Sequence, residues 1–222
     1  MKLPVSLSIF AGSILVANSA VLLSTDFSGR TVTGPTASNV IWTGTGLSAP
    51  SSLTVTNVAP GSLAGGGLFD TANAEGHFAV SKNIGNAGPW SVTIPITLSS
   101  PTISLESVEL DWQHFSNAGA FQGPARNVRW TITVTGSTSG LIDTVIGTAN
   151  AASGLDVLTF GSPVSLNNSE TYDVSILVDN NGNATGNNSG FDAITLNGEI
   201  IPEPSGALLS LLGLSLVLRR RR

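Results

Sequence analysis

The chain has 222 residues, of which 41% are hydrophobic and only 10% are charged, and its formal net charge is −5. It contains no cysteine, which excludes disulfides, zinc thiolate sites, iron–sulfur clusters and thiol nucleophiles. Between residues 21 and 201, thirteen acidic residues stand against four basic ones, Arg30, Lys82, Arg126 and Arg129. Such an acidic segment lacks counter-charge for phosphate backbones, so nucleic acid is not an expected partner.

The first twenty residues have the order of a secretory signal peptide. Lys2 supplies a positive charge, an apolar run follows, and small residues close the segment. Ala17 and Ser19 fit the two small-residue positions before a signal-peptidase cut, which places cleavage near Ser19 or Ala20. The segment 1–20 therefore predicts a signal helix and export, with a buried N-terminal helix or strand as the alternative.

Between residues 21 and 200, short apolar runs alternate with clusters of Gly, Asn, Ser and Pro. Four segments place apolar side chains on one face and polar ones on the other, as strands do: 91–98, 108–113, 128–134 and 173–178. Pro95 has no backbone N–H and suggests that the first of these is an edge strand. Further strands are expected at 40–42, 53–58, 77–80, 141–146, 155–160 and 191–196, with loops at 61–67 and 180–190.

These strands and the absence of an amphipathic helix predict an all-β domain at 21–200. One polar and one apolar face per strand is the antiparallel pattern. We therefore expect a single antiparallel β-sandwich of the jelly-roll type. The body resembles carbohydrate-binding jelly rolls, and this resemblance implies a sandwich with a structural calcium ion near the ends of the chain.

Two calcium sites are conceivable, although no cofactor is the first expectation. Asp179, Asn181 and Asn183 alternate like oxygen ligands in a calcium loop, but Ala184 stands where an EF-hand needs glycine. The alternative is a polar loop that only joins two strands. The resemblance suggests a second site from Asp26 and Asp192; the alternative is two solvated turn aspartates.

Aromatic side chains are the candidates for stacking on sugar rings. Trp90 follows Gly88-Pro89 at the start of a strand and is expected to be exposed, and Phe115 and Phe121 could line a rim. Trp112 and Trp130 are in phase with core residues and are expected to be buried.

Carboxylates on one strand face raise the question of catalysis. Glu109, Asp111 and Gln113 share the polar face of segment 108–113, and paired carboxylates can serve glycoside hydrolysis. The alternative is an ordinary solvated face, which has the same sequence pattern. His114 is in phase with the core and is expected to be a hydrogen-bonded residue at a strand end. We therefore expect that the protein is not an enzyme.

The C-terminal segment has three parts in order: the motif Pro202, Glu203, Pro204 and Ser205, an apolar run at 206–218, and the arginines Arg219, Arg220, Arg221 and Arg222. The apolar run is shorter than the roughly 20 residues that cross a bilayer core. The arginines would stop transfer and stay cytoplasmic.

This arrangement at 201–222 resembles the PEP-CTERM sorting domain. The resemblance implies processing by an exosortase-type membrane protease after passage through the secretion translocon. It also implies transient insertion of the C-terminal helix in the inner membrane, and delivery to the cell surface or extracellular matrix.

Together these features predict an exported bacterial surface or matrix protein with a structural or adhesive, non-enzymatic role, in contact with extracellular polysaccharide. A carbohydrate-binding module is the first alternative and would need an exposed aromatic platform. A glycoside hydrolase is the second and would need two carboxylates facing each other across a cleft.

Overall fold

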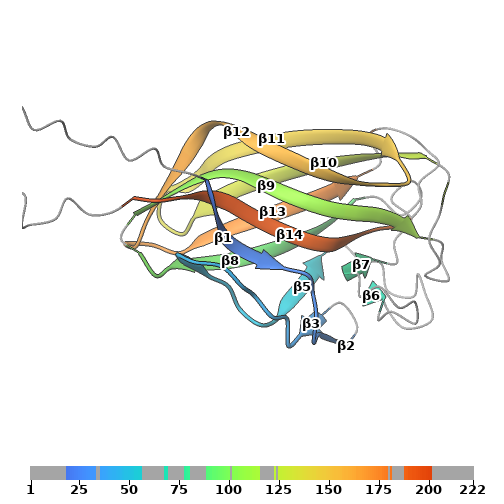
Figure 1. Ribbon diagram of the computed structural model, residues 1–222, viewed down its shortest axis with the longest axis horizontal. Coiled ribbons are helices and arrows are strands. Elements are labelled where there is room, and N and C mark those ends of the chain that lie inside the picture. The colour runs from blue at the N-terminus through green and yellow to red at the C-terminus, as the bar shows by residue number, and fades with distance from the viewer. Residues whose placement is uncertain are drawn as a thin grey trace, which may run out of the picture.

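The computed structural model describes residues 19–33, 36–56, 68–69, 78–80, 89–100, 102–115, 123, 125–179, 181 and 188–201. These residues form fourteen β-strands and no α-helix (Figure 1). Residues 1–18 of the predicted signal helix, the predicted helix at 206–218 and the C-terminal motif lie outside them. Ala20, the last residue of the predicted signal segment, is the first residue of a strand. Within the described ranges, no helix is long and apolar enough to span a membrane.

One sheet has its main strands in the order β12-β9-β14-β7-β6, and β1 pairs with β14. Every pairing in it is antiparallel. Its strands are β1 (Ala20–Thr25), β6 (Leu68–Phe69), β7 (Phe78–Val80), β9 (Thr102–Phe115), β12 (Ser153–Asn167) and β14 (Asn188–Ile200).

The second sheet has the order β11-β10-β13-β8-β5-β3-β2, and β4 also pairs with β8. It too is antiparallel throughout. Its strands are β2 (Thr31–Thr33), β3 (Thr36–Ser38), β4 (Leu47–Ser48), β5 (Leu53–Thr56), β8 (Trp90–Leu98), β10 (Arg126–Gly136), β11 (Gly140–Ala151) and β13 (Tyr172–Asp179).

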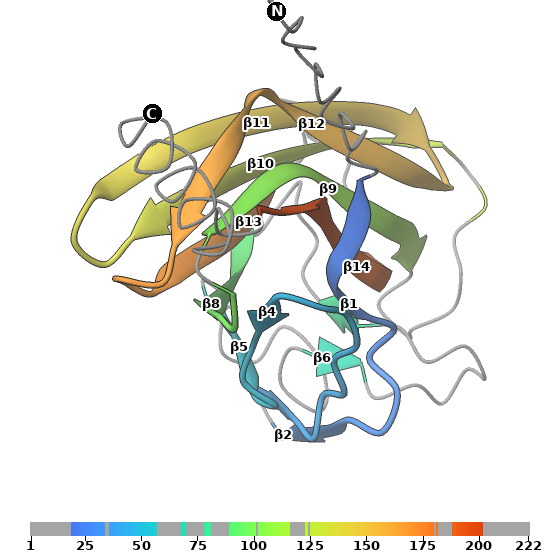
Figure 2. The same cartoon turned by 60° about the vertical axis from the view of Figure 1, so that its left-hand side comes forward.

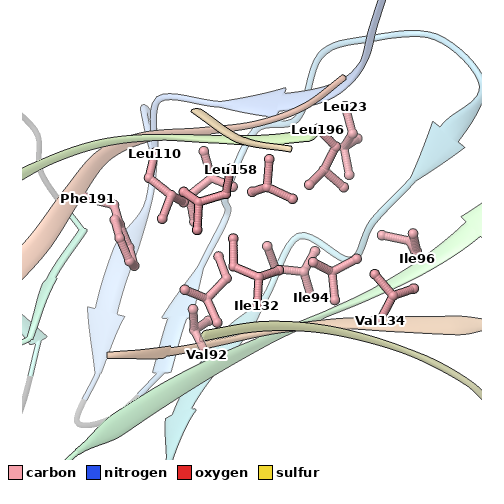
Figure 3. Close-up of a cluster of buried hydrophobic side chains, with 14 of the residues drawn as sticks. Leu23, Val92, Ile94, Ile96, Leu110, Ile132, Val134, Leu158, Phe191 and Leu196 are labelled. Atoms are coloured by element: carbon pink, nitrogen blue, oxygen red, sulfur yellow. The ribbon is translucent and has the colours of Figure 1, made fainter. Parts of the chain in front are cut away.

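The two sheets pack face to face and enclose the core (Figures 1 and 2). Every second side chain of each long strand points inward because successive side chains alternate between the two faces. The figure of the core shows inward side chains of the two sheets meeting: Leu23, Leu110, Leu158, Phe191 and Leu196 from one, and Val92, Ile94, Ile96, Ile132 and Val134 from the other (Figure 3). The expected all-β antiparallel sandwich is confirmed.

The prediction that Pro95 marks an edge strand is wrong. β8 lies inside its sheet, paired with β13 on one side and with β5 and β4 on the other. On that second side, β5 reaches Val92 and β4 begins at Thr97, so Pro95 falls in the interval that neither strand pairs. A residue without an N–H is tolerated there because no ladder bond is required of it.

Other strand assignments differ from expectation as well. Four short strands, β2, β3, β4 and β6, were not expected, and residues 188–190 of the expected loop belong to β14. Residues 40–42 form no strand; only Thr43 makes an isolated bridge, to Ser24. β1 was not expected, because its apolar residues continue the apolar run of the predicted signal peptide. It begins at Ala20, and its pairing with Gly198 makes it an edge of the first sheet.

Candidate functional site

The expectation that Trp90 is an exposed stacking platform is wrong. The side chain is 0% exposed. The strand begins at Trp90 itself, which puts the indole in phase with Val92 and the other inward residues of β8. Phe121 and the side chain of Phe115 lie outside the described residues.

A chain of buried aromatic rings runs through the core. Trp90 lies 5.6 Å from Phe191, Phe191 lies 5.5 Å from Trp130, and Trp130 lies 5.2 Å from Trp112. His114 ends the chain, 5.1 Å from Trp112. The expected burial of Trp112 and Trp130 is confirmed. These tryptophans stabilise the core and offer no surface to a sugar.

Asp156 of β12 connects the two sheets through this aromatic chain. Its Oδ2 accepts hydrogen bonds from Trp112 Nε1 at 3.0 Å and from Trp130 Nε1 at 2.8 Å. Trp112 belongs to β9 of the first sheet and Trp130 to β10 of the second. One carboxylate oxygen therefore holds an indole from each sheet.

The carboxylates proposed for catalysis face no other carboxylate across their strand pairs. Glu109 lies between Val157 of β12 and Thr195 of β14, and Asp111 lies between Leu155 and Ala193. Both acids are partly exposed. The geometry is that of a solvated sheet face.

Gln113 and His114, the last two polar residues of β9, are buried. Gln113 donates to both carboxylate oxygens of Asp192 at 3.2 Å. His114 is buried, and its Nδ1 bonds with the Ser189 hydroxyl at 2.8 Å. The expectation of a hydrogen-bonded histidine at a strand end is confirmed.

Asp179, a calcium candidate, has partners of its own. Arg129 contacts its Oδ2 through Nε at 2.9 Å and through a terminal nitrogen at 2.8 Å. Its Oδ1 accepts from the Asn181 amide at 2.7 Å, which starts the turn after β13. The guanidinium already compensates the carboxylate charge. Asn183 lies outside the described residues, so the loop site stays a prediction.

The second pair of calcium candidates lies on neighbouring strands. β1, which Asp26 follows, pairs with β14, which contains Asp192, and Thr25 lies opposite Ile194. Asp26 follows β1 and accepts from the Ser28 amide at 2.9 Å, and the Ser28 hydrogen bonds hold the pKa of Asp26 below its ordinary value. Among the described residues, no three histidine, aspartate or glutamate side chains group to hold a metal ion.

The outer surface of the second sheet carries a field of hydroxyls, which we call the hydroxyl face. Its outward residues on β5, β8, β13, β10 and β11 include Thr54, Thr56, Ser91, Thr93, Thr97, Ser175, Thr131, Thr133, Thr135, Thr144 and Thr148. All are half-buried or exposed. They share this face because each polar residue alternates with a core residue.

Four of these hydroxyls form one straight row across four strands. The register places Thr144 of β11 opposite Thr133 of β10, Thr133 opposite Ser175 of β13, and Ser175 opposite Thr93 of β8. Neighbouring strands lie about 4.7–4.9 Å apart, which sets the spacing of the row. The Thr93 and Ser175 hydroxyls bond to each other at 2.8 Å. Each hydroxyl has one donor and two acceptor positions, so capacity remains for a ligand.

A groove borders the hydroxyl face where β8 lacks a partner. It consists of two adjoining depressions of ≈ 420 and ≈ 370 Å³, and Thr97 and Thr171 line both. Pro50 and Pro95 line the first. Neither proline can donate to a sheet ladder, so the chain after β4 leaves β8 here and the groove stays open.

Glu170 lines the second depression and fastens two hairpin turns together. It accepts from the amides of Thr138 at 2.8 Å and Ser139 at 3.0 Å, and from the Ser139 hydroxyl at 2.9 Å. These bonds, that from the Thr138 amide first, hold the pKa of Glu170 below its ordinary value. These bonds hold the turn before β13 against the turn between β10 and β11 at this end of the groove.

Sequence reasoning missed the hydroxyl row, Asp156 and Glu170. The alternating threonines of β10 and β8 were visible, but only as polar sides of strands. Two of the three pairings in the row join strands that are distant in sequence, β10 with β13 and β13 with β8, and the sequence alone does not show which strands are neighbours. Asp156 lay within an expected strand, but its two indole partners come from different sheets.

No protein-family model matches the chain, and no curated protein matches its sequence. Among solved structures, it is similar to the family 11 carbohydrate-binding module of a cellulosomal cellulase from Clostridium thermocellum. The identity is 12%, the match covers 84% of this chain and 98% of the module, and the TM-score is 0.39. The same family in complex with a β-1,3-1,4-mixed-linked tetrasaccharide matches at 13% identity over 82% of this chain and 100% of the module, with TM-score 0.36.

An isomalto-dextranase of Arthrobacter globiformis complexed with panose also matches. The identity is 13%, the coverage is 82% of this chain and 32% of the enzyme, and the TM-score is 0.36. Similarities of this size carry no inference about a ligand. The antiparallel sandwich rests on the strand pairing of this chain itself.

Proposed function

We propose that this chain is an exported bacterial surface or extracellular-matrix protein with a structural or adhesive, non-catalytic role, and that its hydroxyl face contacts neutral polysaccharide. The observation that carries the proposal is the row of Thr144, Thr133, Ser175 and Thr93. A polysaccharide is itself a linear array of hydroxyls. A straight row of donors and acceptors can therefore bind it at several points at once.

The mode of contact is hydrogen bonding in place of aromatic stacking. Trp90, Trp112 and Trp130 are buried, so they are not available as a platform. Each hydroxyl contact is worth only about 0.5–1.5 kcal/mol. Useful affinity then comes from many contacts along one polymer, which suits a matrix protein better than an enzyme that must release its product.

The charge of the body favours a neutral polymer. Thirteen acids stand against four basic residues between 21 and 201, and Arg129, the nearest base on this sheet, is engaged by Asp179. An anionic polysaccharide would be repelled. Binding to a neutral polymer should also depend little on ionic strength, because screening acts on charge pairs.

Export rests on the two terminal segments, and one feature of the fold supports it. β1 begins at Ala20, where the predicted signal peptide ends, and β14 ends at Ile200, just before the PEP-CTERM-like motif. β1 and β14 are paired, with Ala20 opposite Gly198. Signal and tag are therefore attached to neighbouring strands, and removing both takes at most Ala20, the first residue of β1, from the two sheets.

The test of the hydroxyl face is a double variant, Thr93→Val with Thr133→Val. Valine keeps the branched shape and the strand preference, so the fold should persist. We expect binding to soluble neutral polysaccharides (dextran, β-glucan, xylan), measured by affinity gel electrophoresis and calorimetry, to weaken about tenfold, from two lost hydrogen bonds of about 0.5–1.5 kcal/mol each.

The matched control is Thr159→Val with Ser165→Ala on β12, two exposed hydroxyls of the first sheet. It should bind like the wild type. An equal loss of affinity in both double variants would contradict a neutral-glycan contact at this face. So would a wild-type protein that binds alginate and other anionic polymers more tightly than neutral ones.

A further inference from the structure

β11 is a long strand with an open edge. It runs for twelve residues at the end of the eight-stranded sheet, and within the described residues β10 is the strand that pairs with it (Figure 2). β12 contacts the inner face of β11: a Cβ at Gly147 would lie 2.9 Å from the Cδ2 of Leu158 on β12, and β12 pairs with β9 of the other sheet. Among the strands that the structure describes, none pairs with the outer edge of β11, so the backbone groups there have no ladder partner among them.

The other edge strands β12, β1, β2 and β6 each carry a feature that disfavours further strand pairing. β12 contains Pro163, and its register with β9 is interrupted between Thr159 and Val164. β1 has an irregular register between Val21 and Leu23. β2 and β6 are three and two residues long. Short edges, prolines and bulges are the usual guards against edge pairing.

β11 has none of these guards along its regular part. Its register with β10 shifts only near the turn, beside Ile142, and is continuous from Asp143 to Ala151. It contains no proline and no basic residue. Ile146 is 60% exposed on its outer face, and Leu141 is 66% exposed. A long, regular edge strand with exposed aliphatic side chains favours pairing with another strand.

We propose that β11 pairs antiparallel with β11 of a second copy, about a two-fold axis through Ile146. Residues opposite each other in an antiparallel pair point to the same face of the sheet. The two-fold axis must therefore run midway between two copies of the same residue, here Ile146. With Ile146 on the axis, its exposed side chain meets its own copy, and Thr144 lies opposite Thr148 of the second copy. The same patch serves both partners, as a closed two-fold dimer requires.

The charges of β11 agree with this register. Its one charged residue is Asp143, which lies opposite Ala149 of the second copy, so no like charges meet. A register with Asp143 on the axis would set two carboxylates side by side, which is destabilising. The dimer joins the two eight-stranded sheets into one continuous sheet, on which the hydroxyl rows of the two copies run parallel to each other, about four residues apart along the strand direction.

Because the chain has no cysteine, single cysteine variants report this register directly. In the full chain, Ile146→Cys should form a covalent dimer on mild oxidation, since opposite Cα atoms lie about 4.5–5.5 Å apart. Thr144→Cys alone should stay monomeric on a non-reducing gel, because its copy lies about four residues away along the strand. An equimolar mixture of Thr144→Cys and Thr148→Cys should link.

The matched control is Leu155→Cys, 61% exposed on the other long edge strand, β12, which should link much less than Ile146→Cys. A second variant, Ile146→Lys, should sediment as a monomer with an unchanged circular dichroism spectrum. Linking of Leu155→Cys or of Thr144→Cys alone as strongly as Ile146→Cys, or a wild-type chain that sediments as a monomer, would overturn the proposal.

Discussion

Replacing Gly198 with alanine is expected to destabilise the protein by at least about 3 kcal/mol. A Cβ at this position would lie 2.0 Å from the carbonyl oxygen of Ser104 and 3.0 Å from the Cα of Leu105. Both atoms belong to the backbone of β9, the strand that shares the largest contact with β14, so neither can rotate away. Overpacking of this kind costs about 1–3 kcal/mol even where side chains can adjust.

The measurement is the free energy of unfolding in urea, followed by circular dichroism. Gly161→Ala is the matched control, since a Cβ at Gly161 meets no atom within 4 Å. It should change the free energy by no more than about 0.5 kcal/mol. A Gly198→Ala variant as stable as Gly161→Ala would mean that β14 and β9 are not packed as described.

Replacing Asp156 with alanine is expected to lower the free energy of unfolding by about 2–4 kcal/mol. The substitution leaves the indole N–H groups of Trp112 and Trp130 without their acceptor. Each unsatisfied buried donor costs about 1–3 kcal/mol. Because the indoles come from different sheets, the loss acts on the contact between the sheets.

Asp156→Asn keeps an acceptor oxygen and should lose about 1 kcal/mol. Asp173→Ala, an exposed acid on β13, is the surface control and should be near neutral. Urea unfolding gives the energies, and the two indole N–H resonances should shift only in the Asp156 variants. Equal stability of Asp156→Ala and Asp173→Ala would show that the indoles find other acceptors.

The sequence predicted the strands that have one solvent-exposed polar face and one buried apolar face. β13 and β10 were visible because burial enforces strict alternation along them, as in Val174, Ile176 and Val178. β1 was hidden because an apolar strand directly after a signal segment has no boundary in composition. β4 and β6, at two residues each, are too short to show a period.

The candidate site was less predictable than the fold. The prediction for Trp90 was wrong because the strand was expected to begin at residue 91. The strand begins at residue 90, so the indole follows the inward alternation of the strand and lies in the core. The hydroxyl row depends on three strand registers between residues up to 82 positions apart, such as Thr93 and Ser175. Such registers follow from packing of the whole sandwich, and local sequence does not specify them.

Export and processing are the central claim, and the most direct test is the intact mass of the protein together with its cellular location in the bacterium that encodes it. The account predicts an extracytoplasmic species that begins after Ser19 or Ala20 and ends near Pro202. That species would retain β2 to β14 whole, and β1 either whole or without its first residue, Ala20. A full-length, unprocessed protein in the cytoplasm would contradict the account, because both terminal segments would then have been misinterpreted.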